Sequence, residues 1–157
     1  MNCPPFLLMD ALKRNLVQRL PEYASGTMLG HRVATKKTEC PRVCIDYLTD
    51  ITTPFSASRD RRVQVTAHVE IVVYSWIDDT PQCEERILDK FADFGVKLGG
   101  LLRDLRLGRN CPDGFTLLSS GEMRGATAST PVNSTSRIVQ FAYDFPSITF
   151  EALIGED

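Results

Sequence analysis

The sequence contains few of the residues that catalytic and metal centres require. Only two histidines are present, His31 and His68, and the five cysteines are scattered along the chain. Structural zinc sites use four nitrogen or sulfur ligands, and Cys40 and Cys44 have no second pair at a suitable spacing. A phosphate-binding loop of the Gly-Lys-Ser/Thr type and a nucleophile-elbow motif are also missing. The sequence therefore predicts a protein that is not an enzyme and that holds no metal or cofactor.

Long hydrophobic runs and a strong net charge are missing as well. No apolar stretch approaches the ~20 residues that a membrane-spanning helix needs, and the run Pro4–Met9 is too short for a secretory signal and lacks its basic start. The net charge is −2, which is not typical of a protein that binds naked nucleic acid tightly. Scattered cysteines in odd number fit reduced thiols in a cytosol better than disulfides. We expect a protein assembled in the cytoplasm, without a membrane partner.

The composition that remains is that of one folded domain. The chain has 157 residues, of which 43% are hydrophobic and 24% charged, enough to bury a core without disulfides or metal. The charge is unevenly placed: residues 1–37 hold six Lys or Arg and two acids, whereas residues 138–157 hold four acids and no Lys or Arg. Complementary ends would orient head-to-tail association of copies, and two independently solvated ends explain the pattern equally well.

Hydrophobic periodicity predicts two main helices. Leucines four residues apart indicate an amphipathic helix over Phe6–Leu20, ended by Pro21. A second helix is expected over Asp78–Leu98, because acidic residues at its start favour the positive end of the helix dipole. Gly99–Gly100 is expected to stop this helix, and Leu101–Leu107 to add a helical turn or two. The buried stripe of the second helix is predicted to comprise Ile87, Leu88, Phe91, Phe94 and Leu98.

A period of two predicts the strands in the first half of the chain. Apolar and polar residues alternate over Arg42–Leu48 and over Val63–Tyr74, which indicates half-buried strands. The segment Thr49–Arg61 between them is expected to be a long exposed loop. The second strand is long compared with the usual ~5–6 residues, and such a strand normally has a further surface to pair with. His68 lies on its polar face, where we expect it to face solvent or an interface.

The C-terminal third is predicted to be β-structure. Phe115–Ser119 and Glu122–Ala128 are expected to form a hairpin with each other, and Arg137–Phe145 alternates again. Pro146 is expected to break this strand before a short last one, Ser147–Leu153. The order of elements indicates an α+β fold, with an antiparallel or mixed sheet, two main helices packed on one face and a long β-hairpin loop. We expect a single domain over residues 1–157.

This order of elements resembles the tail terminator (tail-completion) proteins of long-tailed bacteriophages. The likeness covers about residues 6–145: an opening helix, the strand Pro41–Leu48 after a proline, a long loop, the strand Val63–Tyr74, a helix after an Asp-rich turn, and closing strands of the type Ser136–Tyr143. It rests on patterning and not on an invariant motif. The segment after Pro146 is less typical of the family.

The resemblance implies a homohexameric ring at the head-proximal end of a tail tube, which ends tube polymerisation and provides the head-joining surface. The implied partners are copies of the chain, the tail tube protein and head connector or neck proteins, with DNA only passing through the lumen of the virion. The residues implied to contact the tube or a neighbouring subunit are Arg59, Arg61 and Arg62 of the long loop and, at a second edge, Arg103, Arg106 and Arg109.

Two alternatives fit the same patterns. Another phage neck or minor tail component, such as a head-completion protein, has a similar architecture that patterning separates poorly. A small cytosolic ligand-binding domain is the other, and it requires a pocket with convergent polar groups.

Overall fold

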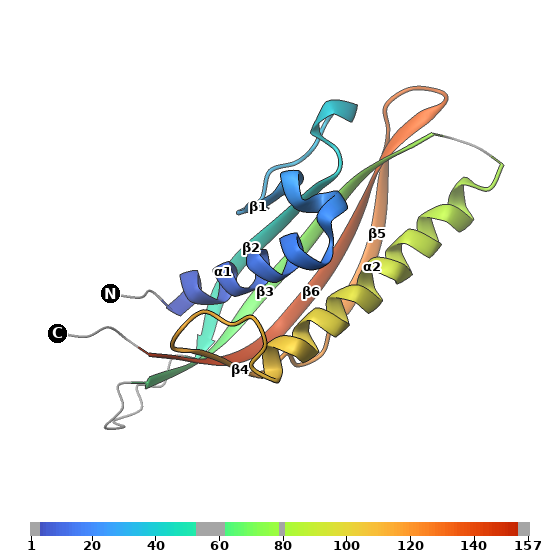
Figure 1. The fold of residues 1–157 in the computed structure, drawn as a ribbon. Helices are drawn as coiled ribbons and strands as arrows, with labels where there is room; N and C mark the ends of the chain where they lie inside the picture. The colour runs from blue at the N-terminus through green and yellow to red at the C-terminus, as the bar shows by residue number, and fades with distance from the viewer. Residues whose placement is uncertain (1–3, 53–61, 79–80, 154–157) are drawn as a thin grey trace.

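The computed structural model describes residues 4–52, 62–78 and 81–153 (Figure 1). A six-stranded mixed sheet carries both main helices on one face, which confirms the predicted α+β class. Two short 3₁₀ helices, η1 and η2, flank the first strand. In chain order the elements are α1 (Pro4–Arg19), η1 (Pro21–Gly26), β1 (Thr27–Leu29), η2 (Lys37–Glu39), β2 (Arg42–Thr52), β3 (Arg62–Asp78), α2 (Cys83–Arg106), β4 (Phe115–Ser119), β5 (Arg124–Pro131) and β6 (Ser136–Leu153).

Two very long strands form the centre of the sheet. The strand order is β1-β2-β3-β6-β4, and β5 also pairs with β6. Strand β3 has 17 residues and β6 has 18, and they pair antiparallel from Arg62 opposite Leu153 to Asp78 opposite Ser136. The predicted long strand is thus confirmed and is longer than its alternating pattern indicated. The predicted β2–β3 hairpin is also antiparallel. The prediction that its loop begins at Thr49 was wrong, because β2 continues to Thr52, and the remaining loop residues, 53–61, lie outside the described residues.

The core lies between this sheet and the two helices. Strand β3 buries every second residue beneath the helices, and burial of each large apolar side chain contributes roughly 1.5–3 kcal/mol. Phe91 and Phe94 of α2 stack on Tyr143 of β6, with ring centroids 5.2 and 5.3 Å apart. The fully buried residues that join the helices to the sheet include Leu8, Leu12 and Leu16 of α1, Leu98 and Leu101 of α2, and Val69, Ile71 and Val73 of β3.

The prediction that Gly99 and Gly100 end the second helix was wrong. Helix α2 continues through both glycines to Arg106 and has 24 residues. Glycine in a helix interior costs roughly 1 kcal/mol relative to alanine, but Leu101 and Leu105 beyond the pair are completely buried. Continued burial of the apolar stripe outweighs the local cost, because packing supplies most of the stability of helices in proteins.

The predicted hairpin between β4 and β5 was also wrong. Both strands pair with β6, one after the other along the same edge: β5 with residues 137–144 and β4 with residues 149–152. Pro146 does not end β6, because it falls between these two stretches and beside a register shift opposite Ala67–Val69 of β3. A proline at such a position removes no ladder hydrogen bond. Gly121 turns the chain between β4 and β5, with a φ of +63°.

The outer face of the sheet, opposite the two main helices, changes from apolar to polar along its length. At one end Val72 and Tyr74 pack with Ala34 from the segment after β1. Towards the other end the face is polar, and His68 Nε2 lies 2.5 Å from Asp144 Oδ1 on the neighbouring strand. This part of the outer face remains half-exposed.

Candidate assembly surface

The arginines predicted for partner contact fall in two separate places. Arg59 and Arg61 lie outside the described residues. Arg62 is the first residue of β3, with a half-exposed side chain whose Nη1 is 3.5 Å from Glu151 Oε1 on β6. Its exposure leaves room for a contact with a neighbour, and its role there remains a prediction.

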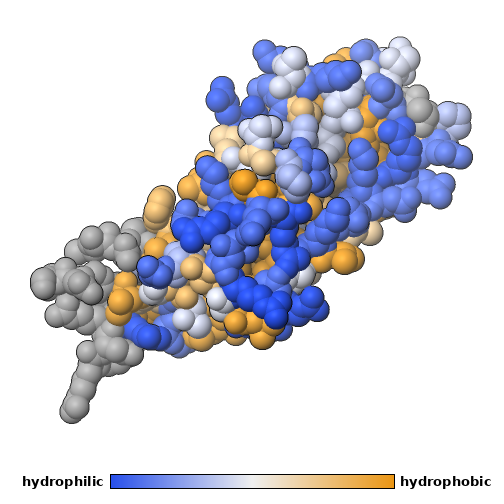
Figure 2. Space-filling model, in the orientation of Figure 1, coloured by the Kyte–Doolittle hydropathy of each residue, from blue (hydrophilic) through white to orange (hydrophobic). Residues whose placement is uncertain are grey.

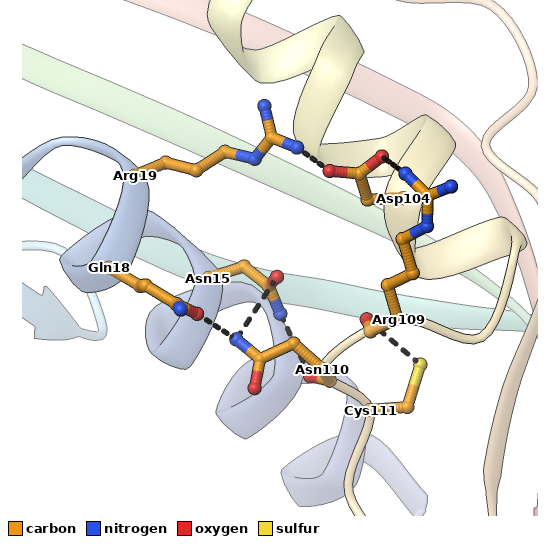
Figure 3. Close-up of polar contacts among 7 residues, drawn as sticks. All are labelled: Asn15, Gln18, Arg19, Asp104, Arg109, Asn110 and Cys111. Carbon is orange, nitrogen blue, oxygen red and sulfur yellow. Dashed lines mark hydrogen bonds and ion pairs between the residues drawn. The ribbon is translucent and has the colours of Figure 1, made fainter.

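The second predicted group lies at the C-terminal end of α2. Arg103 and Arg106 are exposed in its last turns. Arg109 follows the helix, and its Nη1 is 3.2 Å from Asp104 Oδ1. Asp104 also pairs with Arg19 of α1 (Figure 3). The charge of Arg109 is therefore partly neutralised within its own chain, which makes Arg103 and Arg106 the more available members of this group.

A polar cluster beside these residues joins α1 to the segment that follows α2 (Figure 3). The buried Asn15 side chain donates to the carbonyls of Ala11 and Asn110, at 2.8 and 3.1 Å. Asn110 has a φ of +52° and donates through its side chain to Gln18. A buried amide left without partners costs about 1–3 kcal/mol, so the cluster holds this segment in place by satisfying Asn15. We interpret it as a structural brace.

The strongest candidate for partner binding is β5, which sequence patterning did not single out. Strand β5 lies at the edge of the sheet (Figure 1), and all eight of its residues are exposed. It pairs with β6 without a register shift from Arg124 to Pro131, and no other described strand pairs with it. A regular, unpaired edge of this kind is a template for a further strand.

The hydrogen-bonding groups of this edge can be assigned from the adjoining turn. Val132 N donates to Ser136 O at 3.0 Å, and antiparallel partners alternate between bonded and non-bonded pairs. Residues 124, 126, 128 and 130 therefore bond β6. Gly125, Thr127 and Ser129 direct their N–H and C=O groups outwards. The edge presents three free donors spaced two residues apart, as an added strand requires.

The opposite edge of the sheet is blunted by comparison. Strand β1 covers β2 only at residues 43–45, and the rest of β2 has two register shifts, between Tyr47 and Thr49 and between Asp50 and Thr52. Bulges of this kind twist an edge away from flat pairing and are a common protection against aggregation. Strand β5 has no such register shift and ends only at Pro131. Of the two edges of the sheet, the β5 edge is therefore the one open to regular pairing with a further strand.

An apolar flank of α2 lies beside the β5 edge. Gly95 faces Met123, just before β5, since a Cβ on Gly95 would lie 3.9 Å from Met123 Cε. Lys97 points the other way, with Nζ 4.0 Å from Glu22 of η1. Leu88 lies two helical turns before Gly95 on the same flank and is 60% exposed, and Val96, which follows Gly95, is 76% exposed. The prediction that Leu88 is buried was therefore wrong.

Figure 2 shows this helical side of the molecule, where apolar surface is interspersed with hydrophilic residues. Apolar side chains at the centre of a patch with a polar surround are typical of protein interfaces. We call the combination of strand β5 with Leu88, Val96 and Met123 the β5–α2 surface. Its strand supplies directional hydrogen bonds and its helix supplies apolar area.

Comparison of the sequence with known protein families gave no match, and comparison with curated proteins gave none either. Among residues 4–52, 62–78 and 81–153, no group of three His, Cys, Asp or Glu side chains is arranged to hold a metal ion. Within the same described part of the chain, no helix combines the length and apolarity needed to cross a membrane.

Proposed function

We propose that the protein is a ring-forming structural component of a bacteriophage tail, a tail terminator that ends tube polymerisation and offers a joining surface for the head. The observation that carries the proposal is the open edge of β5 beside an apolar helix flank. The resemblance in the order of elements supports the same interpretation. This function involves no turnover, because it depends on complementary surfaces between copies of the chain and the last ring of the tube.

The geometry of one subunit favours a ring over a symmetric dimer. The open edge lies on one side of the sheet and the bulged β2 edge on the other, so the two sides of a subunit present different surfaces. Contacts between unlike surfaces are heterologous, and they close into rings when the rotation between subunits permits. A stable interface buries about 1,200–2,000 Å² in total, more than one added strand supplies, so the apolar flank of α2 is needed to complete it.

The test is a proline placed at an outward-facing position of β5. Thr127→Pro removes a donor that does not bond β6, so the subunit is expected to fold while strand addition is blocked. Thr127→Val keeps the N–H and serves as the matched control. Light-scattering mass and negative-stain images should show rings for the wild type and the Val variant, and subunits or small species for the Pro variant. Ser129→Pro repeats the test at a second outward-facing position.

An assembly assay with tail tubes separates the proposed terminator from another neck component. A terminator caps tubes and fixes their length, whereas a head-completion protein binds the head side and leaves tube length unchanged. A wild-type protein that stays monomeric at every concentration, and neither caps nor shortens tubes, would overturn the proposal.

A further inference from the structure

The connection between β1 and β2 covers the apolar end of the outer face of the sheet. The two strands are parallel, so the chain must cross one face of the sheet before β2 can begin. Residues 31–35 have no regular secondary structure, and η2 follows them. Figure 1 shows this connection as an open stretch of chain between β1 and η2. We call residues 31–39 the strap.

The strap contributes very little apolar surface of its own. Ala34 is its one buried residue, whereas Val33 beside it is 57% exposed. Beneath Ala34 lie the larger buried side chains of Val72, Tyr74 and Ile138. Hydrophobic stabilisation is roughly proportional to the apolar area removed from water, so a single methyl group holds the strap only weakly. The strap conceals more apolar surface of the sheet than it buries of its own.

The backbone of the strap is not part of the sheet. The last backbone hydrogen bond that follows β1 joins Gly30 N to Ile45 O at 2.7 Å. Within the described part of the chain, residues 31–35 form no backbone–backbone hydrogen bond. Gly30 has a φ of +87°, and a Cβ there would meet nothing within 4 Å. A segment with few buried contacts and no ladder bonds opens at low cost compared with the strands beneath it.

Polar contacts from one arginine of β2 hold the strap closed. Arg42 Nη1 donates to the carbonyl oxygens of Arg32 and Val33, both at 3.3 Å. Arg42 Nη2 is 3.4 Å from Glu39 Oε2 at the end of the strap. Glu39 Oε1 in turn accepts from Thr35 N and Oγ1, at 3.1 and 3.0 Å. The two ends of the strap are thus tied to the same guanidinium group.

Two further contacts pin the start of the strap to the sheet. His31 Nε2 lies 2.6 Å from the hydroxyl oxygen of Tyr74, and Cys44 Sγ lies 3.5 Å from the carbonyl oxygen of Arg32. Cys44 is completely buried beneath this segment. Its thiol therefore becomes accessible when the strap is lifted.

We propose that the strap is a latched cover, held by Arg42, which opens as a unit while the sheet stays folded. Gly30 is its hinge, because glycine absorbs backbone changes that other residues resist. Opening uncovers the Cys44 thiol and the apolar side chains of β3 and β6 around it. The strap lies on the face of the sheet opposite α2, so this device does not depend on the β5–α2 surface.

The test is the rate at which Cys44 reacts with iodoacetamide in the folded full-length protein. Tandem mass spectrometry of the digested protein reads this cysteine separately from the others. We expect Cys44 to be modified at a rate that stays constant as urea is raised below the unfolding transition, because local opening exposes little surface. Modification that required unfolding of the sheet would instead accelerate with urea in step with the transition seen by circular dichroism.

Arg42→Ala removes the latch and is expected to accelerate modification of Cys44 on the order of tenfold. Burial raises the pKa of the Cys44 thiol, and the charge of Arg42 partly offsets this rise. The thiolate is the reactive form, so loss of this charge alone would slow the reaction, and a faster reaction reports opening. Arg14→Ala removes an exposed arginine of α1 that pairs with Asp10; it is the matched control and is expected to react as the wild type does.

Tyr74→Phe tests the strap through a second contact. The substitution keeps the apolar ring and removes the hydroxyl that meets His31, so modification of Cys44 is expected to accelerate roughly two- to tenfold. Urea dependence is measured for each variant, and a rate that stays constant below its transition shows that the sheet remains folded.

Two results would overturn the proposal. One is a wild-type Cys44 that reacts only as the whole domain unfolds, with the urea dependence of global unfolding. The other is an Arg42→Ala variant that reacts no faster than the wild type, which would show that this arginine does not hold the strap.

Discussion

Substitution of Gly125 by alanine tests how β5 is held against α2. A Cβ at this position would lie 2.4 Å from Phe91 Cζ, whereas carbon atoms in contact prefer about 3.5–4.0 Å. Phe91 cannot easily yield, because its ring stacks on Tyr143 at 5.2 Å and its carbonyl accepts the Tyr143 hydroxyl at 2.6 Å. Overpacking of this kind costs about 1–3 kcal/mol, partly offset by about 0.4–1 kcal/mol from the lower entropy of the unfolded chain. We expect a net loss of about 1–2 kcal/mol.

The loss is measured by urea denaturation followed by circular dichroism. For a domain of this size it corresponds to a decrease in Tm of roughly 2–8 °C. Gly125→Ala combined with Phe91→Leu is the matched control: the smaller side chain removes the clash, so the double variant should recover stability relative to the sum of the two single effects. An alanine variant as stable as the wild type would refute the close packing of β5 on α2.

Two further predictions follow from α2 and β6. Gly99→Ala is expected to raise the free energy of unfolding by about 0.5–1 kcal/mol in the same denaturation assay. The glycine is helical, and a Cβ there would meet nothing within 4 Å. A decrease would indicate that the helix does not continue through residue 99. Burial raises the pKa of Tyr143 above its ordinary value of 10.0. Its contribution to the free energy of unfolding is therefore complete below about pH 10. This contribution is lost as the pH rises further, because the phenol of the unfolded chain ionises first. Tyr143→Phe should make the loss of stability at alkaline pH less steep. Part of the loss should remain, because burial also raises the pKa values of Tyr23 and Tyr74. An unchanged slope would contradict the assignment of this loss to Tyr143.

The features predicted correctly from sequence were those set by regular burial. Alternation over Val63–Tyr74 predicted the long strand because β3 buries one face along its whole length. The errors arose where distant partners override local signals. Gly99–Gly100 has the composition of a helix end, but the leucines after it are buried by contacts that no local window contains. Pro146 does not interrupt β6, because it lies where the neighbour of β6 changes from β5 to β4.

The candidate surface was harder to predict because β5 lacks a large apolar residue. Its sequence, Arg-Gly-Ala-Thr-Ala-Ser-Thr-Pro, has no alternation of large and polar side chains, and a pattern search detects strands by that alternation. The sequence feature that could have indicated an exposed edge strand was this run of small residues and threonines without a buried face. The arginines, by contrast, are conspicuous in sequence, but Arg109 turns out to be paired with Asp104 of its own chain.

The pairing of β3 with β6 sets the order of events during synthesis. Arg62 meets Leu153, and contacts between residues so distant in sequence form late because a long loop must first be closed. Strand β5 has β6 as its partner, so a ribosome-bound chain cannot present a finished β5 edge until its last strand has emerged. Under the proposed self-assembly through β5, the topology therefore makes the contact edge available only after β6 has been translated.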